Sequence, residues 1–427
     1  MSLSQSVKKI INSKLIKDTG IYTFFKVFDK LIPFFLLPII TRLLNPEEYG
    51  VFVLFQALAG ITLPLMTLSI DSSILLNYFK IKKEEFNNYF SSGYVLLLIF
   101  SLFFIVVVLI FNKPLAMFVE FPAEWFLVIL ILCFFQLHTN IALNLYQVKR
   151  EPKKYGIFSI ILTTLKNVLM LLFVIQYDMK WEGMILGYTF GYGLFFFISL
   201  FIFKHHKLFT AEIKKDYLID NIKVGTPLSL HQIGSWLASS STRIIVSGLL
   251  GAAATGSFGI GATIGMIVLF IQDSFNKAFV PYLFENLNNF NTKVEKKLIK
   301  LTFAYNVILF LFAFVIGLFG YLFLEVIFGS AYAEGKEVVY LICFAYAFDG
   351  MYKMHVNYIF YTKKTHFIFF ITMTTGLLNI VLSYLFINMY GLMGGALSLC
   401  VINFIGYLLS WYIGNRVYPM KWIRMAV

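Results

Sequence analysis

The sequence predicts an all-α integral membrane protein with about 12 transmembrane helices, arranged as two parallel six-helix repeats around a central cavity. Hydrophobic residues make up 59% of the chain and charged residues 13%, and the mean hydropathy is +0.80. A soluble domain has about 25% charged residues, so this composition indicates a chain that lies largely within a bilayer. Apolar runs of about 20 residues, long enough as helices to cross the hydrocarbon, recur along the whole sequence.

The apolar runs and the polar segments between them divide the chain into an N-terminal lobe (1–204), a cytoplasmic amphipathic linker (205–221) and a C-terminal lobe (222–427). Each lobe is expected to hold six spans. The predicted spans are 20–44, 49–79, 88–112, 123–148, 155–177, 182–203, 222–249, 253–284, 299–324, 337–361, 366–388 and 391–415.

The distribution of Lys and Arg fixes the orientation of these spans. Of 35 basic residues, 25 fall in segments on the side of the N-terminus, 3 fall in segments on the other side and 7 lie within spans. Because basic residues concentrate in cytoplasmic loops, both termini are predicted to be cytoplasmic. The net charge of +13 is therefore a topology signal that favours contact with anionic membrane lipids, and we expect no nucleic-acid partner.

The first span, Ile21 to Leu44, carries charges within its apolar run. Lys26, Asp29 and Lys30 are three or four residues apart, so they share one face of a helix. A charge that faces lipid costs at least about 2.5–3.5 kcal/mol, so this face should point into protein or water. The span is predicted to form one wall of a polar cavity.

Two sequence matches indicate that the halves are repeats. Residues 42–52, RLLNPEEYGVF, match residues 248–258, GLLGAAATGSF, at an offset of 206, and Asn167 falls on Asn379 at an offset of 212. The matching residues occupy equivalent spans and turns in each set of six. An even number of spans returns the chain to its starting side, so the repeats are expected to be parallel.

The segments LIPFFLLPIITR and LLNPEEYG, in residues 31–52, resemble the start of O-antigen and polysaccharide (Wzx-type) flippases. These belong to the multidrug/oligosaccharidyl-lipid/polysaccharide (MOP) exporter superfamily. The resemblance implies a MATE-like fold in which two six-helix lobes enclose a cavity that opens alternately to each side of the bacterial inner membrane. It also implies a cargo of oligosaccharide on polyprenyl pyrophosphate, with a polysaccharide polymerase and glycosyltransferases as partners. The lipid II flippases resemble the chain less, because they usually have two further spans.

The charges within the predicted spans favour an anionic cargo. The predicted spans contain seven basic residues and four aspartates, which is an excess of three positive charges. A pyrophosphate needs such an excess when it leaves water for a site of low dielectric constant. The candidate substrate-binding cations are Lys26, Lys30, Lys166, Arg243 and Arg42. For each the alternative is a structural ion pair, or, for Arg42, an anchor at the outer surface.

The acidic residues are candidates for a gate or for ion coupling. Asp273 with Lys277, and Asp349 with Lys353, are spaced i,i+4 and are expected to form local pairs. The sharper alternative is an inner gate in which Asp71, Asp273 and Lys277 exchange partners between the lobes, since the repeat places Asp71 opposite Lys277. A second alternative is that a coupling proton or sodium ion binds Asp29 or Asp349.

The sequence contains no metal-ligand, nucleotide-binding or catalytic motif, so we expect no cofactor, no metal and no enzymatic activity. Cys133, Cys343 and Cys400 fall within apolar runs at no disulfide spacing. Two other functions stay open. One is a cation-coupled exporter of drugs or organic cations from the same superfamily, and the other is a membrane polymerase or ligase, against which the short outer loops argue.

Overall fold

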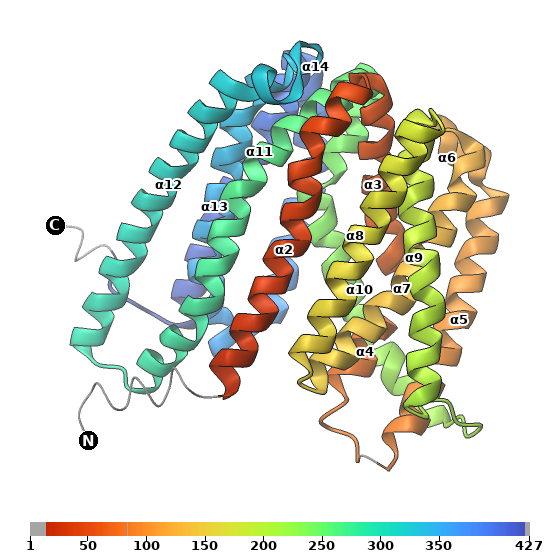
Figure 1. Cartoon of the computed structure of the whole chain (residues 1–427). Coiled ribbons are helices and arrows are strands. Elements are labelled where there is room, and N and C mark those ends of the chain that lie inside the picture. Colours follow the sequence, from red (N-terminus) through yellow and green to blue (C-terminus); the bar gives the residue numbers. More distant parts are fainter. Residues whose placement is uncertain (1–13, 83, 423–427) are drawn as a thin grey trace. The chain divides into compact units, whose positions relative to one another are not determined.

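The structure is a computed structural model that describes residues 14–82 and 84–422, and every regular element in that part of the chain is a helix (Figure 1). The predicted cytoplasmic residues Lys8, Lys9, Lys83 and Arg424 lie outside the described residues. The all-helical membrane fold that the sequence predicts is confirmed.

The first half of the chain forms helices of 22 to 30 residues with shorter helices at their ends. The elements are α2 (Lys14–Leu43), α3 (Pro46–Thr67), α4 (Ile70–Leu76), α5 (Phe86–Ile110), α6 (Asn112–Val119), η1 (Ala123–Trp125), α7 (Phe126–Val148), α8 (Pro152–Gln176) and α9 (Lys180–His205). The predicted second span is broken into α3 and α4, because Leu68 and Ser69 both adopt positive φ angles.

The second half forms fewer and longer helices. They are α10 (Lys215–Ser239), α11 (Ser241–Asn288), α12 (Thr292–Phe328), η2 (Ser330–Tyr332), α13 (Gly335–Tyr361) and α14 (His366–Val417). Among the described residues, eight helices are long and apolar enough to cross a membrane, and they include α11 and α14.

Both α11 and α14 turn at a glycine and so consist of two legs. Gly251 has φ 84° and Gly391 has φ 59°, conformations that side chains other than glycine rarely adopt. Gly251 lies in the predicted turn after span 7, and Gly391 is the first residue of predicted span 12. Predicted span 7 is divided between α10 and the first leg of α11, as span 2 is between α3 and α4, and the other predicted spans each coincide with a helix or a helical leg.

The same turns in the first half use different residues. At the repeat position of Gly251, Asn45 begins α3 with a reciprocal cap: its Oδ1 accepts from the backbone N–H of Glu48 at 2.9 Å, and the Glu48 carboxylate accepts from the backbone N–H of Asn45 at 3.0 Å. Pro46 follows at the first helical position, which needs no N–H donor.

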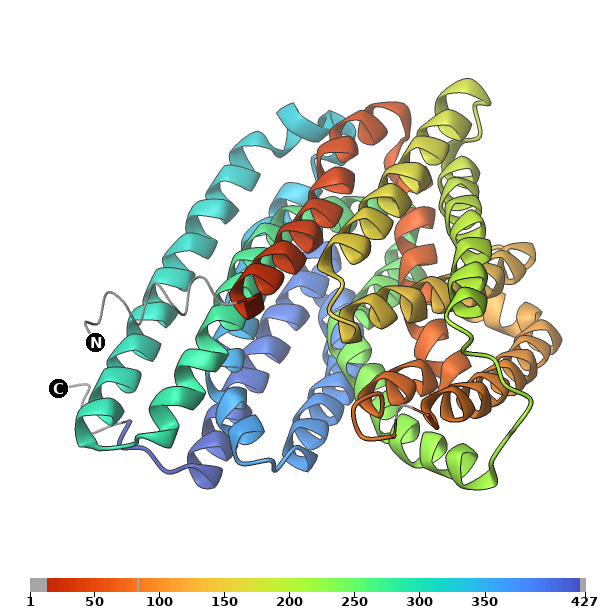
Figure 2. The same ribbon diagram turned by 60° about the horizontal axis from the view of Figure 1, so that its bottom comes forward.

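The described helices belong to two compact units. One unit contains α2, the last part of α3, α4 to α9 and α10 up to Ser229; the other contains residues 44–57, the rest of α10 and α11 to α14. In the first unit α8 packs against α9 and α2, and in the second α13 packs against α11, α12 and α14. Figures 1 and 2 both show α8 beside α9 and α12 beside the second leg of α11.

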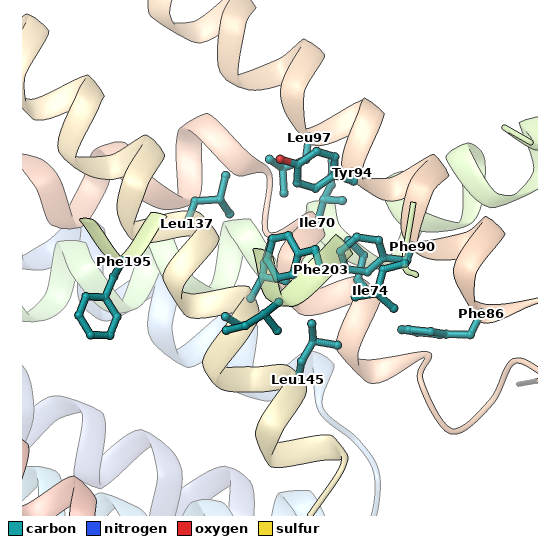
Figure 3. Close-up of a cluster of buried hydrophobic side chains, with 14 of the residues drawn as sticks. Ile70, Ile74, Phe86, Phe90, Tyr94, Leu97, Leu137, Leu145, Phe195 and Phe203 are labelled. Carbon is teal, nitrogen blue, oxygen red and sulfur yellow. The ribbon is translucent and has the colours of Figure 1, made fainter. Parts of the chain in front are cut away.

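The core of the first unit is a cluster of apolar side chains from α4, α5, α7, α8 and α9 (Figure 3). Ile70, Phe90 and Phe203 are fully buried in it, and the Phe90 and Phe203 rings meet edge to face at 5.6 Å. Figure 3 shows Phe195 on the side of the cluster away from Phe86. This packing holds the helices that carry the charged side chains described below.

The predicted linker, residues 205–221, lies within the first unit, and its first part is not the helix that its sequence suggests. Residues 206–214 are not helical, and Leu208 is buried in the core of the first unit instead of lying at an interface. The Ser91 hydroxyl donates to the Leu208 carbonyl at 3.0 Å and accepts from the Thr210 backbone N–H at 2.7 Å. Bonds to α5 thus replace the internal bonds of a helix.

Within the same unit, polar side chains hold the first turns of α10. The Asp220 carboxylate accepts from the Tyr89 hydroxyl at 2.7 Å and from the Asn77 amide at 3.0 Å. The Tyr217 hydroxyl donates to the Glu85 carboxylate. These bonds link α10 to α4 and α5 at the predicted cytoplasmic side.

The two repeat segments meet within the second unit. Gly50 on α3 and Gly256 on α11 face each other so closely that a Cβ atom on Gly256 would overlap the Pro46 carbonyl. Only glycine permits this approach of two helix backbones. Nearby, the buried Tyr332 hydroxyl donates at 3.0 Å to the carbonyl of Leu44, just beyond the end of α2.

Candidate functional site

The second unit contains a cavity of about 560 Å³ that is lined by α10, α11, α13 and α14. Apolar side chains form much of its wall, but charged residues from two of these helices reach it. They are Arg243 on α11 with Asp349 and Lys353 on α13. A cavity that combines apolar walls with a few placed polar groups is the usual form of a small-molecule or headgroup site.

Of the two basic side chains that line this cavity, Arg243 is the one that forms no ion pair among the described residues. Its side chain is half-buried in the first leg of α11, just after the serine pair Ser239 and Ser240, which also line the cavity. Within the described residues no carboxylate forms an ion pair with Arg243, although Tyr346 lies close enough to interact electrostatically with both Arg243 and Asp349. A guanidinium in this position can bind a phosphate through paired N–H donors.

Lys353, by contrast, is held between two carboxylates. Its Nζ lies 2.6 Å from Asp273 Oδ1 on α11 and 2.9 Å from Asp349 Oδ2 one turn earlier on α13. The Gln272 amide also donates to Asp349 Oδ2, at 2.6 Å. This cluster ties α11 to α13.

One predicted local pair is confirmed and the other is wrong. Asp349 and Lys353 form the expected i,i+4 contact. Asp273 does not pair with Lys277 but with Lys353, and the Lys277 side chain is exposed. Lys353 on the neighbouring helix reaches this half-buried carboxylate, and Lys277, one turn away on the same helix as Asp273, does not. Asp71 lies on α4 with the Thr67 hydroxyl 3.5 Å from its Oδ1, and its predicted exchange with Asp273 and Lys277 stays a prediction.

Amide and imidazole side chains add hydrogen-bonding groups to the cavity. Asn357 donates to Asn276 at 2.8 Å, and His231 lies 3.2 Å from the Thr372 hydroxyl. Asn403 also lines the cavity. Sequence reasoning did not select Asn276, Asn357 or Asn403 as site residues, because they come from three different helices and share no spacing that links them. Such groups are suited to binding hydroxyls of a sugar.

The cations of the first unit have different surroundings. Lys166 on α8 lies over two aromatic rings of α9, 4.9 Å from the centroid of Tyr188 and 5.2 Å from that of Tyr192. Lys26 on α2 lies 5.7 Å from the ring centroid of Tyr155. These rings stabilise a partly desolvated ammonium by cation–π attraction.

Asp29 lies near both of these lysines. Its carboxylate accepts a hydrogen bond from the Ser159 hydroxyl on α8 and interacts electrostatically with Lys166 and Lys26. The first unit therefore brings three predicted site residues together across the α2–α8 contact. The other two predicted cations of this unit, Lys30 and Arg42, have exposed side chains on α2, with Arg42 in its last turn.

Solved structures of membrane transporters have the same fold. The chain is similar to the lipid II flippase MurJ in an inward closed conformation, with a TM-score of 0.67, 14% identity and coverage of 92% of this chain and 87% of MurJ. It is also similar to an inward-facing multidrug resistance MATE family transporter of the MOP superfamily, with a TM-score of 0.63, 16% identity and coverage of 91% and 98%.

The described residues thus have the fold of multi-pass membrane proteins of this kind, with a charged cavity in the second unit. The chain belongs to the polysaccharide biosynthesis protein family, whose model matches residues 15–287. It is 23% identical over 364 residues to Lsg locus putative protein 1 of Haemophilus influenzae, which covers 83% of this chain and 87% of that protein. An uncharacterized membrane protein of the same organism is 22% identical over 357 residues, which covers 82% and 85%.

Proposed function

We propose that the protein moves an oligosaccharide linked to polyprenyl pyrophosphate across the bacterial inner membrane by alternating access. The product would supply the synthesis of O antigen, capsule or exopolysaccharide, with glycosyltransferases acting before it and a polymerase after it. The family supports the link with polysaccharide synthesis, and the fold supports movement of a cargo through the membrane. The concentration of basic residues on one side supports cytoplasmic termini.

The observation that carries this proposal is the Arg243 guanidinium in the cavity of the second unit. Lys353 is occupied by Asp273 and Asp349, but Arg243 has no carboxylate partner among the described residues. An unpaired cation in a largely apolar cavity is costly, so it is retained where it binds a charged partner. A pyrophosphate group supplies that partner.

The same charges argue against an exporter of organic cations. Such a cargo needs a free carboxylate, and both carboxylates of the cavity cluster already contact Lys353. The fold is shared with multidrug transporters, so the alternative has to be tested directly. Expression in a drug-sensitive strain distinguishes the two: raised resistance to cationic dyes supports the exporter and contradicts the flippase.

The decisive experiment uses a strain that lacks the corresponding gene and is complemented with variants of this chain. Arg243→Gln is expected to abolish surface polysaccharide and to raise the amount of lipid-linked oligosaccharide on the cytoplasmic side, whereas Arg243→Lys restores part of the export. Arg416→Gln is the control, because Arg416 stacks on Tyr412 at 5.0 Å in the last turn of α14 and does not line the cavity. Wild-type export by Arg243→Gln at equal protein level would remove the cavity from the transport mechanism.

The lysines of the first unit are proposed to bind the headgroup in another step of the cycle. Lys166→Ala is expected to abolish surface polysaccharide while the protein level persists. Lys166→Arg should retain part of it, because a guanidinium also stacks on Tyr188 and Tyr192. Unchanged polysaccharide in the alanine variant would remove Lys166 from the site.

A further inference from the structure

A second feature of the first unit is an apolar groove of about 580 Å³ between α8 and α9. The rings of Phe158 and Phe195 form its floor and meet edge to face at 4.7 Å. Half-exposed side chains line its walls, Ile157 and Ile161 on α8 and Leu194 and Ile198 on α9. Phe158 and Phe195 also belong to the buried core cluster, so the floor of the groove is rigid.

The groove runs along the helices from a charged end. Its lining residues on α8 extend from Lys154 to Leu165, about 16 Å of helix at 1.5 Å per residue. Lys154 is in the first turn of α8, on the predicted cytoplasmic side, and Tyr146 of α7 lies at the same end. A long apolar chain placed in the groove would therefore begin next to a lysine and continue into the hydrocarbon.

The charged end of the groove belongs to a larger basic cluster. The turn from α7 to α8 and the end of α9 contribute six basic side chains, and His206 interacts electrostatically with Lys149 and Lys154, so the two segments are close. Glu151 is the acidic residue of this turn and pairs with Lys154 at 3.0 Å. The basic residues are Lys149, Arg150, Lys153, Lys154, Lys204 and Lys207.

The combination of groove and cations sets this place apart from other apolar surface of the unit. A groove of about 430 Å³ between α2 and α8, and one of about 480 Å³ between α5 and α7, are lined without a charged side chain. The preference of basic residues for the cytoplasmic side explains the charges but not the groove that begins beneath them. Both features together match a molecule with an anionic head and an apolar chain.

We propose that this groove is a binding site for one anionic glycerophospholipid. Its phosphate would lie at Lys153 and Lys154, and one acyl chain would occupy the groove while the other stays in the bilayer. The length of the groove favours this occupant, because its wall on α8 is about 16 Å long, close to the length of one fatty acyl chain and shorter than a long polyprenyl chain. The attraction of each lysine for an anionic headgroup adds to the burial of the chain.

The test is native mass spectrometry of the purified full-length protein in detergent, titrated with phosphatidylglycerol or phosphatidylcholine. The wild-type protein should bind one phosphatidylglycerol in preference to phosphatidylcholine. The variant Lys153→Gln/Lys154→Gln should lose this preference by about fivefold per lysine. Ile161→Trp, which fills the groove and leaves the charges in place, should weaken binding of phosphatidylglycerol as well.

The control variant is Lys293→Gln/Lys296→Gln, which removes two exposed lysines at the start of α12 on the same predicted side, away from this groove. It should bind phosphatidylglycerol as the wild-type protein does. The proposal is wrong if the Lys153 and Lys154 variant or the Ile161→Trp variant keeps wild-type binding. It is also wrong if a polyprenyl phosphate displaces phosphatidylglycerol from the groove at equal concentration, since the site would then belong to the transported lipid.

Discussion

Asn167 and Asn379 occupy equivalent positions in the two repeats, but only Asn379 joins its helix to a neighbour. The Asn379 amide on α14 donates to the Leu237 carbonyl of α10 at 3.0 Å and to the Ser241 and Thr242 hydroxyls of α11 at 3.1 and 3.0 Å. The Asn167 amide donates to the Thr163 carbonyl of its own helix, and its buried Oδ1 accepts no hydrogen bond from the described residues. An apolar groove lies beside it, between α2 and α8.

The difference predicts unequal effects of the same substitution. Asn379→Ala should lower the free energy of unfolding by about 1–2 kcal/mol, because it removes the hydrogen bonds that join α14 to α10 and α11. Asn167→Ala should change it by less than about 0.5 kcal/mol, because it breaks only a bond within α8 and removes an unsatisfied carbonyl. Thermal unfolding of both variants in one detergent tests this. Equal losses would mean that the contact between helices contributes no stability.

The Asp273–Lys353–Asp349 cluster should be sensitive to loss of its lysine. Lys353→Met leaves two carboxylates close together without a cation, so it should destabilise the protein by about 1–3 kcal/mol. Adding Asp349→Asn should restore part of this loss, because it removes one of the two like charges. Lys277→Met is the matched control and should lie within about 0.5 kcal/mol of the wild type, since its side chain is exposed. A larger effect of Lys277→Met than of Lys353→Met would contradict the pairing in the structure.

These examples show which parts of the molecule the sequence could predict. Most of the spans follow from apolar patterns within about 25 residues, and the structure has helices or helical legs at those places. The partner of Asp273 could not be found in this way. Whether Asp273 pairs with Lys277 or with Lys353 depends on how α11 packs on α13, and the sequence near Asp273 does not give that packing. The burial of Leu208 could not be predicted for a similar reason, because its position in a polar linker gives no sign that it packs in the core.

The Tyr217–Glu85 hydrogen bond should make the linker sensitive to pH. The bond to Tyr217, followed by the charge of Lys214, lowers the pKa of Glu85, and the bond to Glu85 raises the pKa of Tyr217 to about 12. A lowered carboxyl pKa contributes stability above the unfolded value near 4.3, and this contribution is lost as pH falls through the folded value. The raised tyrosine pKa contributes stability below the unfolded value near 10, and this contribution is lost as pH rises through about 12.

Tyr217→Phe is therefore expected to increase amide hydrogen exchange in residues 208–214 at pH 7. The difference from the wild type should vanish when the pH falls below the folded pKa of Glu85. Glu85→Ala should have a similar effect at pH 7, and combining the two substitutions should add little, because each removes the same bond. Additive effects, or a difference that persists in acid, would show that the hydrogen bond does not hold the linker.

The crossing of the repeat segments at Gly50 and Gly256 gives the last prediction. A methyl group on Gly256 would overlap the Pro46 carbonyl, so Gly256→Ala must push α3 and α11 apart and should cost about 1–3 kcal/mol of stability. Gly248 lies one turn before the Gly251 bend and has open space around its Cα atom, so Gly248→Ala should be neutral or raise stability by up to about 1 kcal/mol through helix propensity. Thermal unfolding compares the two alanines directly, and surface polysaccharide reports whether the crossing also matters for transport. A Gly256→Ala protein as stable as the Gly248→Ala protein would show that the backbones can separate at no cost, and the match between the two repeat segments would then need another explanation.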